Sequence, residues 1–207
     1  EAGELYSVPQ SIGYEIASYD RTRINGQLTI QIQPAENFTA TLDYTFAELE
    51  LARTYSNLSS WFNFDAQETS YTDGPIATPL IYKERLGDSD LSMASGKDAF
   101  RSELDSVGLN LVWDLNDNLR LMLDHHSSSS ERNPASDFGS NALLSLAIWD
   151  RDETTGYFGA GQELPILEVV TGAPISAASV QTTGSVFERA VSDMEIDQTR
   201  LAGTYTF

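Results

Sequence analysis

The sequence predicts an all-β protein of antiparallel strands, and two observations carry this prediction. From Ile24 to Gln33, apolar residues or glycine occupy the even positions, and Asn, Gln and Thr occupy the odd ones. The same alternation returns from Phe38 to Phe46, after a break of only four residues. A period of two places successive side chains on opposite faces of a strand, and no helix sorts residues in this way.

These two stretches predict strands over residues 21–33 and 38–47, joined as a hairpin. Their polar face consists mostly of Gln, Asn and Thr, whereas a soluble sheet usually exposes Lys and Glu. This composition indicates a face that lines a water-filled or plugged lumen. Alternation then lapses over residues 48–102, where turn residues accumulate, and we expect a long loop there.

Alternation resumes in residues 103–114 and, after the turn Asn116-Asp117-Asn118, in residues 119–126. Asn and Asp tolerate the left-handed backbone of tight turns, so this is a second predicted hairpin. Residues 127–195 are predicted to form a second long loop, with a short helix over 141–149 capped by Asn141 and an edge strand over 164–170. The last predicted strand covers residues 196–207.

Short turns on one side and long loops on the other are typical of outer-membrane barrels. The nine residues from Ile24 to Ile32 extend over about 30 Å, or about 23 Å along the membrane normal at a tilt near 40°, close to the expected apolar band of about 25 Å. We also expect no charged residue on the apolar face. The predicted fold is therefore an all-β segment, residues 1–207, whose antiparallel strands form part of a transmembrane β-barrel with two long extracellular loops.

Aromatic residues support this prediction, because they fall at both ends of the apolar stretches and form two predicted interfacial girdles. Phe38, Trp113, Tyr205 and Phe207 lie at the end with tight turns, and Tyr44 and Phe46 lie at the other. The alternative is a soluble secreted β-sandwich that binds carbohydrate. In that fold the face of Leu28 would be buried against a second sheet.

The composition disfavours several functions. The 207 residues include 12 Lys and Arg against 31 Asp and Glu, a formal net charge of −19, whereas nucleic-acid binding needs a basic face. There is no cysteine, so disulfides, thiolate metal sites and thiol catalysis are excluded. No nucleophile elbow, phosphate-binding glycine loop or zinc-protease motif occurs, and we expect neither enzymatic activity nor a cofactor.

Two stretches resemble strands of TonB-dependent outer-membrane receptors. The first runs from Arg21 to Gln31 and continues through Leu42-Asp43-Tyr44-Thr45-Phe46 to Trp61-Phe62-Asn63-Phe64, and the second runs from Asp197 to Phe207. The resemblance implies a bacterial outer-membrane protein that imports a nutrient such as an iron chelate, a cobalamin or an oligosaccharide. It also implies a plug and further barrel strands, both missing here, so that the chain is a fragment of a receptor.

The partners implied by the resemblance are outer-membrane lipid and lipopolysaccharide, and a periplasmic energy-transducing protein that acts through the missing plug. Ligand capture would then fall to aromatic residues of the two long loops, which stack on sugar rings or aryl groups. These candidates are Trp61, Phe62, Phe64, Tyr71, Tyr82, Trp149, Tyr157 and Phe158. The competing interpretation is that such residues form a small core within the loops.

No metal site is predicted. His125 and His126 are adjacent on a strand and point to opposite faces, so they do not chelate one ion together. The segment Asp114–Asn118 resembles the start of a calcium loop but lacks its glycine and its final acid, and is better explained as a turn. The acidic run Asp150–Glu153 is interpreted as a solvated loop face, with binding of divalent cations at the lipopolysaccharide surface as the alternative.

Overall fold

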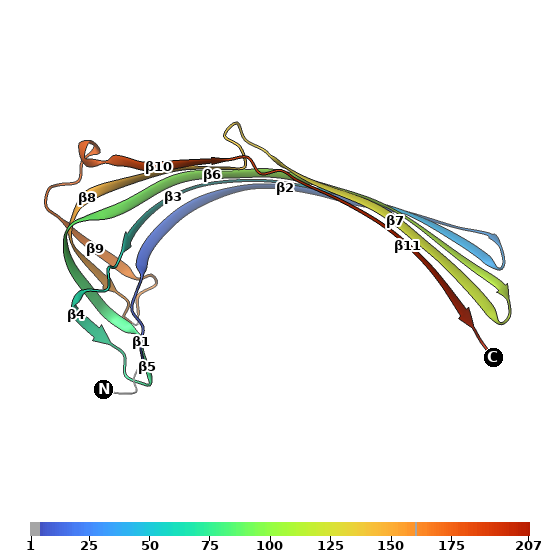
Figure 1. The fold of residues 1–207 in the computed structure, drawn as a ribbon, viewed down its shortest axis with the longest axis horizontal. Coiled ribbons are helices and arrows are strands. Elements are labelled where there is room, and N and C mark those ends of the chain that lie inside the picture. The colour runs from blue at the N-terminus through green and yellow to red at the C-terminus, as the bar shows by residue number, and fades with distance from the viewer. Residues whose placement is uncertain (1–4, 160) are drawn as a thin grey trace. The chain divides into compact units, whose positions relative to one another are not determined.

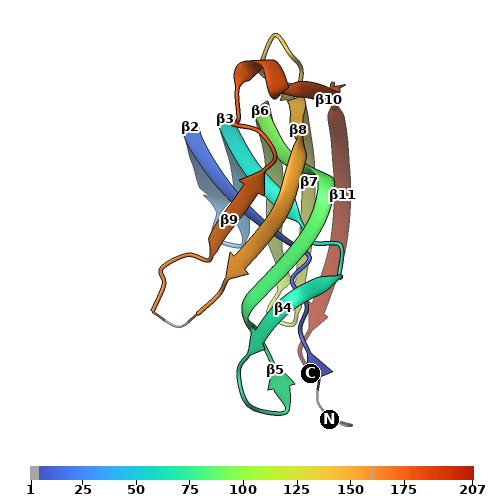
Figure 2. The same cartoon turned by 90° about the vertical axis from the view of Figure 1, so that its left-hand side faces the viewer.

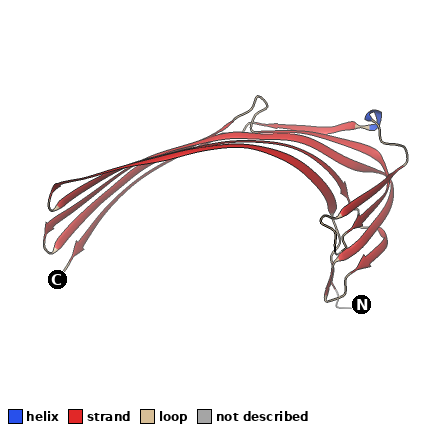
Figure 3. Cartoon of the chain, turned by 180° about the vertical axis from the view of Figure 1, so that it is seen from behind, coloured by secondary structure: helices blue, strands red, loops and turns tan. Residues whose placement is uncertain are grey.

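The computed structural model describes residues 5–159 and 161–207, except for the side chains of Leu86 and Asp88. Strands dominate this part of the chain, and its one helical element is a single 3-10 turn (Figure 3). The elements are β1 (Leu5–Tyr6), β2 (Ser11–Ala35), β3 (Phe38–Trp61), β4 (Ala66–Tyr71), β5 (Ile76–Ala77), β6 (Pro79–Asn116), β7 (Leu119–Pro134), β8 (Asn141–Tyr157), β9 (Ile166–Thr171), η1 (Ala177–Ser179), β10 (Gln181–Glu188) and β11 (Ser192–Tyr205). The all-β prediction is thus confirmed (Figure 1).

The chain divides into two compact units. Unit 1 comprises residues 1–18, 54–97 and 142–186, and unit 2 comprises 19–53, 98–141 and 187–207. The long strands β2, β3 and β6 contribute one part to each unit. In the described residues, no helix is long and apolar enough to span a membrane.

In unit 2 the strand order is β2-β3-β6-β7-β11. β6 pairs antiparallel with β7, and β7 pairs antiparallel with β11 without a register shift. β2 and β11 are the two edges, so the described strands do not close into a barrel. The antiparallel sheet is confirmed, whereas the transmembrane barrel remains a prediction.

The two tight turns are found where the sequence predicts them. The chain reverses at Glu36–Asn37 and again at Asp117–Asn118. In the second turn, the side-chain oxygen of Asn116 accepts hydrogen bonds from the backbone N–H groups of Asn118 and Leu119, both at 3.0 Å. This is the Asx-turn chemistry expected of the segment Asp114–Asn118. Pro34 is accommodated within β2, an edge strand, where its missing N–H is not required.

Unit 1 has the order β2-β3-β6-β8-β10, and β4 and β9 add to β6 and β8 respectively. Figure 2 shows the upper parts of β2, β3, β6 and β8 side by side. A small core joins these strands: Ile12, Phe62 and Tyr82 are buried, with Tyr14, Ala66, Phe158 and Leu167 packed against them. β1 and β5 form a separate short pair and are parallel, an exception to the antiparallel prediction.

The two long loops predicted for residues 48–102 and 127–195 are wrong. β3 continues to Trp61, β6 begins at Pro79, and β4, β8, β9 and β10 lie within these ranges. The serine run Ser127–Ser130 belongs to β7 and pairs with both β6 and β11. A strand with polar residues on both faces shows no apolar alternation, so its periodicity does not reveal it.

The helix predicted over residues 141–149 is also wrong, because these residues begin β8. A short apolar run such as Ala-Leu-Leu-Ser-Leu-Ala-Ile is ambiguous between a helix and a buried strand. Pairing with β6 and β10 decides the case, and Ala147 and Ile148 are both buried there. The predicted edge strand is found as β9, which pairs with β8 over Ile166–Thr171.

Candidate functional site

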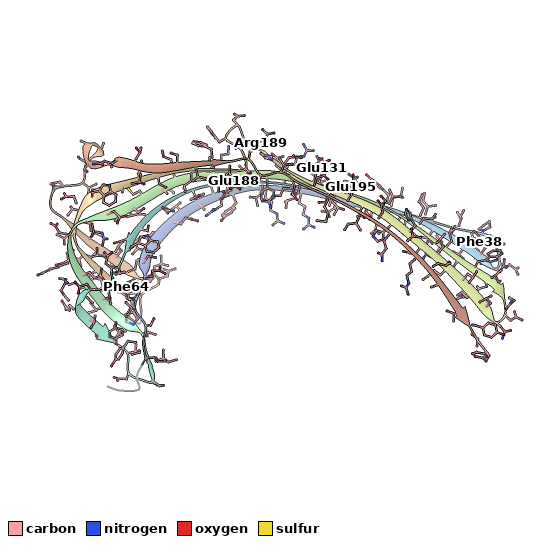
Figure 4. All side chains as sticks on the ribbon, in the orientation of Figure 1. Phe38, Phe64, Glu131, Glu188, Arg189 and Glu195 are labelled. Atoms are coloured by element: carbon pink, nitrogen blue, oxygen red, sulfur yellow. The ribbon has the colours of Figure 1, made fainter. Side chains whose placement is uncertain are left out.

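Unit 2 carries an uncovered apolar band on one face of its sheet. Its members are exposed large hydrophobic side chains at alternate strand positions: Ile24, Leu28, Ile30 and Ile32 of β2, Leu42, Tyr44 and Phe46 of β3, Val107, Leu109 and Trp113 of β6, and Leu201 and Tyr205 of β11. Leu28 is 58% exposed and Leu201 is 75% exposed. In Figure 4 side chains project from both faces of this sheet, and no second layer of strands lies over them. Within the described residues, unit 2 therefore supplies no partner sheet of its own of the kind that a β-sandwich needs.

Cross-strand contacts define the two faces. On the polar face, the Thr29 hydroxyl donates to Asp43 at 2.6 Å and the Gln31 amide donates to the Thr41 hydroxyl at 3.1 Å. On the apolar face, the ring of Phe46 covers Gly26, because a Cβ added at that glycine would collide with the ring. The two faces predicted for residues 24–33 are therefore found in the structure.

The apolar band crosses the strands diagonally. In the register of β6, β7 and β11, Leu111, Leu123 and Leu201 lie in one row. Four residues further along the strands, away from the tight turns, Val107 of β6 is aligned with Ser127 of β7 and Asp197 of β11. Among these three strands, only β6 is apolar at this level. The band thus shifts by four residues over two strand spacings. Strands tilted near 40° and about 4.8 Å apart that cross a slab shift by about 4 Å, slightly more than one residue, per strand. The observed shift is therefore larger than this simple geometry gives.

The expectation that the apolar face carries no charge is wrong. Tyr44 donates to Asp105 at 2.5 Å, and Arg101 contacts Glu48 and Glu103, so these residues share the apolar face. Alternation and register place nine carboxylates of unit 2 there: Asp20, Glu48, Glu50, Glu103, Asp105, Glu131, Asp193, Glu195 and Asp197. The diagonal course of the band explains them, because on each strand they lie beyond its limit on the side away from the tight turns.

The eight candidate aromatic residues do not form one surface. Phe62 and Tyr82 are each 2% exposed and pack edge to face, with ring centroids 5.1 Å apart. Phe158 packs against the same core. These three therefore match the competing interpretation of a small core, and the two buried rings offer no surface to a ligand. Burial raises the pKa of the Tyr82 phenol to about 12, with the Glu84 charge acting in the same direction.

The other five candidates lie nearer the surface of unit 1. Trp61, Phe64 and Trp149 are about half or more exposed, at 51%, 63% and 49%. Tyr71 packs edge to face on Tyr6, and the Tyr157 hydroxyl donates to Glu168 at 2.8 Å. Trp61, Phe64 and Trp149 therefore keep free ring surface for contact with a ligand.

Phe64 has the most unusual backbone of the candidates. Its φ of 67° is in the left-handed region, which bulky residues rarely adopt. The buried Glu84 carboxylate accepts hydrogen bonds from the backbone N–H groups of the two residues that flank Phe64, Asn63 at 2.8 Å and Asp65 at 3.1 Å. These two contacts hold the turn in place while the Phe64 ring stays in solvent (Figure 4).

Arg151 supports the same turn from β8 and is 2% exposed. Its guanidinium donates to the carbonyl groups of Trp61 and Asp90 and to the Thr154 hydroxyl. Burial lowers the pKa of Arg151, while the charges of Asp90 and Glu84 oppose that shift. This role cannot be predicted from the sequence, because Arg151 stands within an acidic run whose composition predicts a solvated face.

Glu153 of that run is paired rather than solvated. Its carboxylate contacts Lys83 at 2.7 Å and Arg85 at 2.6 Å. Hydrogen bonds from these two cations lower the pKa of the Glu153 carboxyl. Asp150 also has a partner, since its side chain accepts from the Ala173 N–H at 2.7 Å. In the described residues no group of three or more potential metal ligands comes together.

No protein-family model matches the chain, and no curated protein is detectably similar to it in sequence. The two faces of unit 2 and the exposed aromatic rings of unit 1 are therefore the features from which we infer a function.

Proposed function

We propose that unit 2 forms part of a transmembrane β-barrel in a bacterial outer membrane, with the apolar band facing lipid and the polar face lining the lumen. One observation carries the proposal: the band is exposed on β2, β3, β6 and β11, with Leu123 of β7 in line between the last two, and its limit is staggered between β6 and β11. A water-soluble sheet would leave these side chains in water, at a cost of about 25 cal/mol per Å² of apolar area. A lipid bilayer removes that cost.

On this basis the chain is part of a receptor for a nutrient such as an iron chelate, a cobalamin or an oligosaccharide. Trp61, Phe64 and Trp149 are the proposed contact residues, since their exposed rings suit stacking on a planar or sugar ligand. The function is binding and passage rather than bond-making. Lipopolysaccharide, further barrel strands, a plug and a periplasmic energy-transducing protein are the proposed partners.

A matched pair of substitutions tests the lipid-facing assignment. Ile30 and Gln31 are neighbours on β2 and point to opposite faces. In the full-length protein, we expect Ile30→Lys to reduce the amount recovered in the outer membrane of producing cells, because lysine at the bilayer midplane costs about 2–4 kcal/mol. Gln31→Lys should leave that amount unchanged.

Recovery is measured by immunoblotting of fractionated cells, with total expression as the control. Equal recovery of both variants, at the level of the unmodified protein, would contradict the proposal. A larger loss with Gln31→Lys would reverse the assignment of the two faces.

A further inference from the structure

The two faces of unit 2 differ in charge. The polar face carries six arginines, Arg21, Arg23, Arg53, Arg120, Arg132 and Arg200, against five acids, Asp43, Asp98, Asp114, Asp124 and Glu188, a formal balance of +1. The apolar face carries the nine carboxylates named above against Arg101 alone, a balance of −8. Half of the 12 cationic residues of a strongly acidic chain thus lie on one face of one sheet. A face of this kind attracts anions.

A cleft of about 440 Å³ lies on the polar face at the end away from the tight turns. It is lined by Leu51 and Arg53 of β3, Asp98 and Phe100 of β6, Arg132 of β7 and Glu188 of β10, among others. All of these residues belong to unit 2. The cleft therefore combines apolar walls with several charged groups.

Arg132 is the cation of this cleft that keeps its charge available. Its guanidinium carbon lies 3.7 Å from the centroid of the Phe100 ring, a stacked arrangement that leaves the N–H groups at the edge of the plane. Within the described residues this stacking is its one interaction, with neither a hydrogen bond nor an ion pair. Stacking fixes the guanidinium in place and leaves its donors for a ligand.

The two carboxylates of the cleft, Asp98 and Glu188, do not repel a bound anion equally. Asp98 is compensated, because Arg53 donates to one of its oxygens at 2.8 Å and the Asn141 amide donates to the other at 2.7 Å. The Glu188 carboxylate has no such pairing among the described residues, although its backbone carbonyl accepts hydrogen bonds from the N–H and hydroxyl of Ser140. Arg132 and Glu188 are therefore the charges that act on a ligand.

We infer that this cleft binds a small organic anion, with a carboxylate or phosphate group held by Arg132 and an apolar part held against Phe100 and Leu51. A guanidinium matches both anionic groups through paired N–H donors. The inference rests on the proposed function, in which the polar face lines the lumen and the cleft lies on the route of the imported ligand. It narrows the nutrient to anionic compounds.

Calorimetric titration of the full 207-residue chain in neutral detergent micelles tests this inference, with phenyl phosphate as the probe. Inorganic phosphate lacks the apolar part, and phenol lacks the charge. We expect phenyl phosphate to bind more tightly than either. Arg132→Gln should weaken its binding by about tenfold or more, the usual scale of a charge-assisted contact. Glu188→Gln should tighten it.

Arg200→Gln is the matched control, since Arg200 is an exposed arginine on the same face and the variant changes the net charge equally. It should change the affinity by less than about twofold. Phe100→Leu gives a second variant, which should weaken binding because it removes the ring under Arg132. Equal affinity of the Arg132→Gln and Arg200→Gln variants, or equal binding of phenol and phenyl phosphate, would overturn the inference.

The outcomes separate this inference from the membrane assignment. Anion binding is measured in micelles and does not depend on insertion into a cell membrane. If Ile30→Lys and Gln31→Lys differ as expected while Arg132→Gln has no effect, the anion site fails and the lipid-facing assignment stands. If Arg132→Gln weakens binding as expected while Ile30→Lys and Gln31→Lys do not differ, the anion site is supported but its place in a barrel lumen is not.

Discussion

The two units differ in how much of their apolar surface is buried within the chain. Unit 1 buries a small apolar core, since Ile12, Phe62 and Tyr82 pack together and each is at most 6% exposed, although other apolar side chains of this unit, such as Ile16 and Leu164, remain exposed. In unit 2, among the described residues, the one buried hydrophobic side chain is that of Ala99, while the apolar band remains open. Both arrangements occur along the single strand β2, where Ile12 is buried and Ile30 is 50% exposed. The described part of unit 2 therefore lacks a core like that of unit 1, as we expect if its apolar band faces lipid as proposed.

Replacing isoleucine by phenylalanine at two positions of β2 tests this difference between the units. Ile12→Phe forces a larger side chain into a packed core, and we expect it to lower the free energy of unfolding by about 1–3 kcal/mol. Ile30→Phe should leave it nearly unchanged, because a fluid medium rearranges around the ring. Denaturant titration in detergent micelles, followed by circular dichroism, measures both variants. A comparable loss at Ile30 would show that the band packs against a fixed partner.

The ion pairs of unit 1 give a smaller effect that depends on pH. Lys83 and Arg85 lower the pKa of Glu153 in the folded chain. The unfolded chain therefore binds the proton more readily, so these pairs stabilise the fold above the ordinary glutamate pKa of about 4.3. That contribution is lost as the pH falls through the lower, folded value.

We expect the thermal midpoint of the unmodified chain to fall over this acidic window more than that of Glu153→Gln, which lacks the titrating group. Glu163→Gln is the control, because Glu163 is exposed and has no ion pair among those described. Identical pH profiles for the unmodified and Glu153→Gln chains would show that the pairs add nothing measurable. This outcome would leave the core of unit 1 as its main source of stability.

Prediction from sequence succeeded where one face is apolar and the other polar. The alternation of Leu28, Thr29, Ile30 and Gln31 predicts a strand, its faces and its turn, because a one-residue slip would exchange the two faces. It failed where this contrast is missing. The sequence of Ser127–Ser130, polar on both faces, predicts a loop, although this segment is paired on both sides in β7.

The site was predicted less well than the fold. Aromatic residue type selected Phe62 and Phe64 alike, but only the packing of unit 1 separates the buried ring from the exposed one. Glu84 and Arg151 were missed, because charged residues rarely become buried unless partners far apart in the sequence surround them. The arginines of the polar face were missed for a related reason, since their common face emerges only from the register of five strands.

The assignment of the apolar band to lipid and of the polar face to water can be tested residue by residue along β2. Because the chain has no cysteine, single cysteines can be placed along β2 from Ile24 to Gln33 and spin-labelled, leaving out Gly26, which Phe46 covers. In lipid bilayers, collision rates with oxygen, which concentrates in lipid, and with a water-soluble nickel chelate are then measured at each position. We predict high oxygen collision rates at the even positions and high nickel rates at the odd ones. Uniformly high nickel rates at both sets of positions would contradict this assignment.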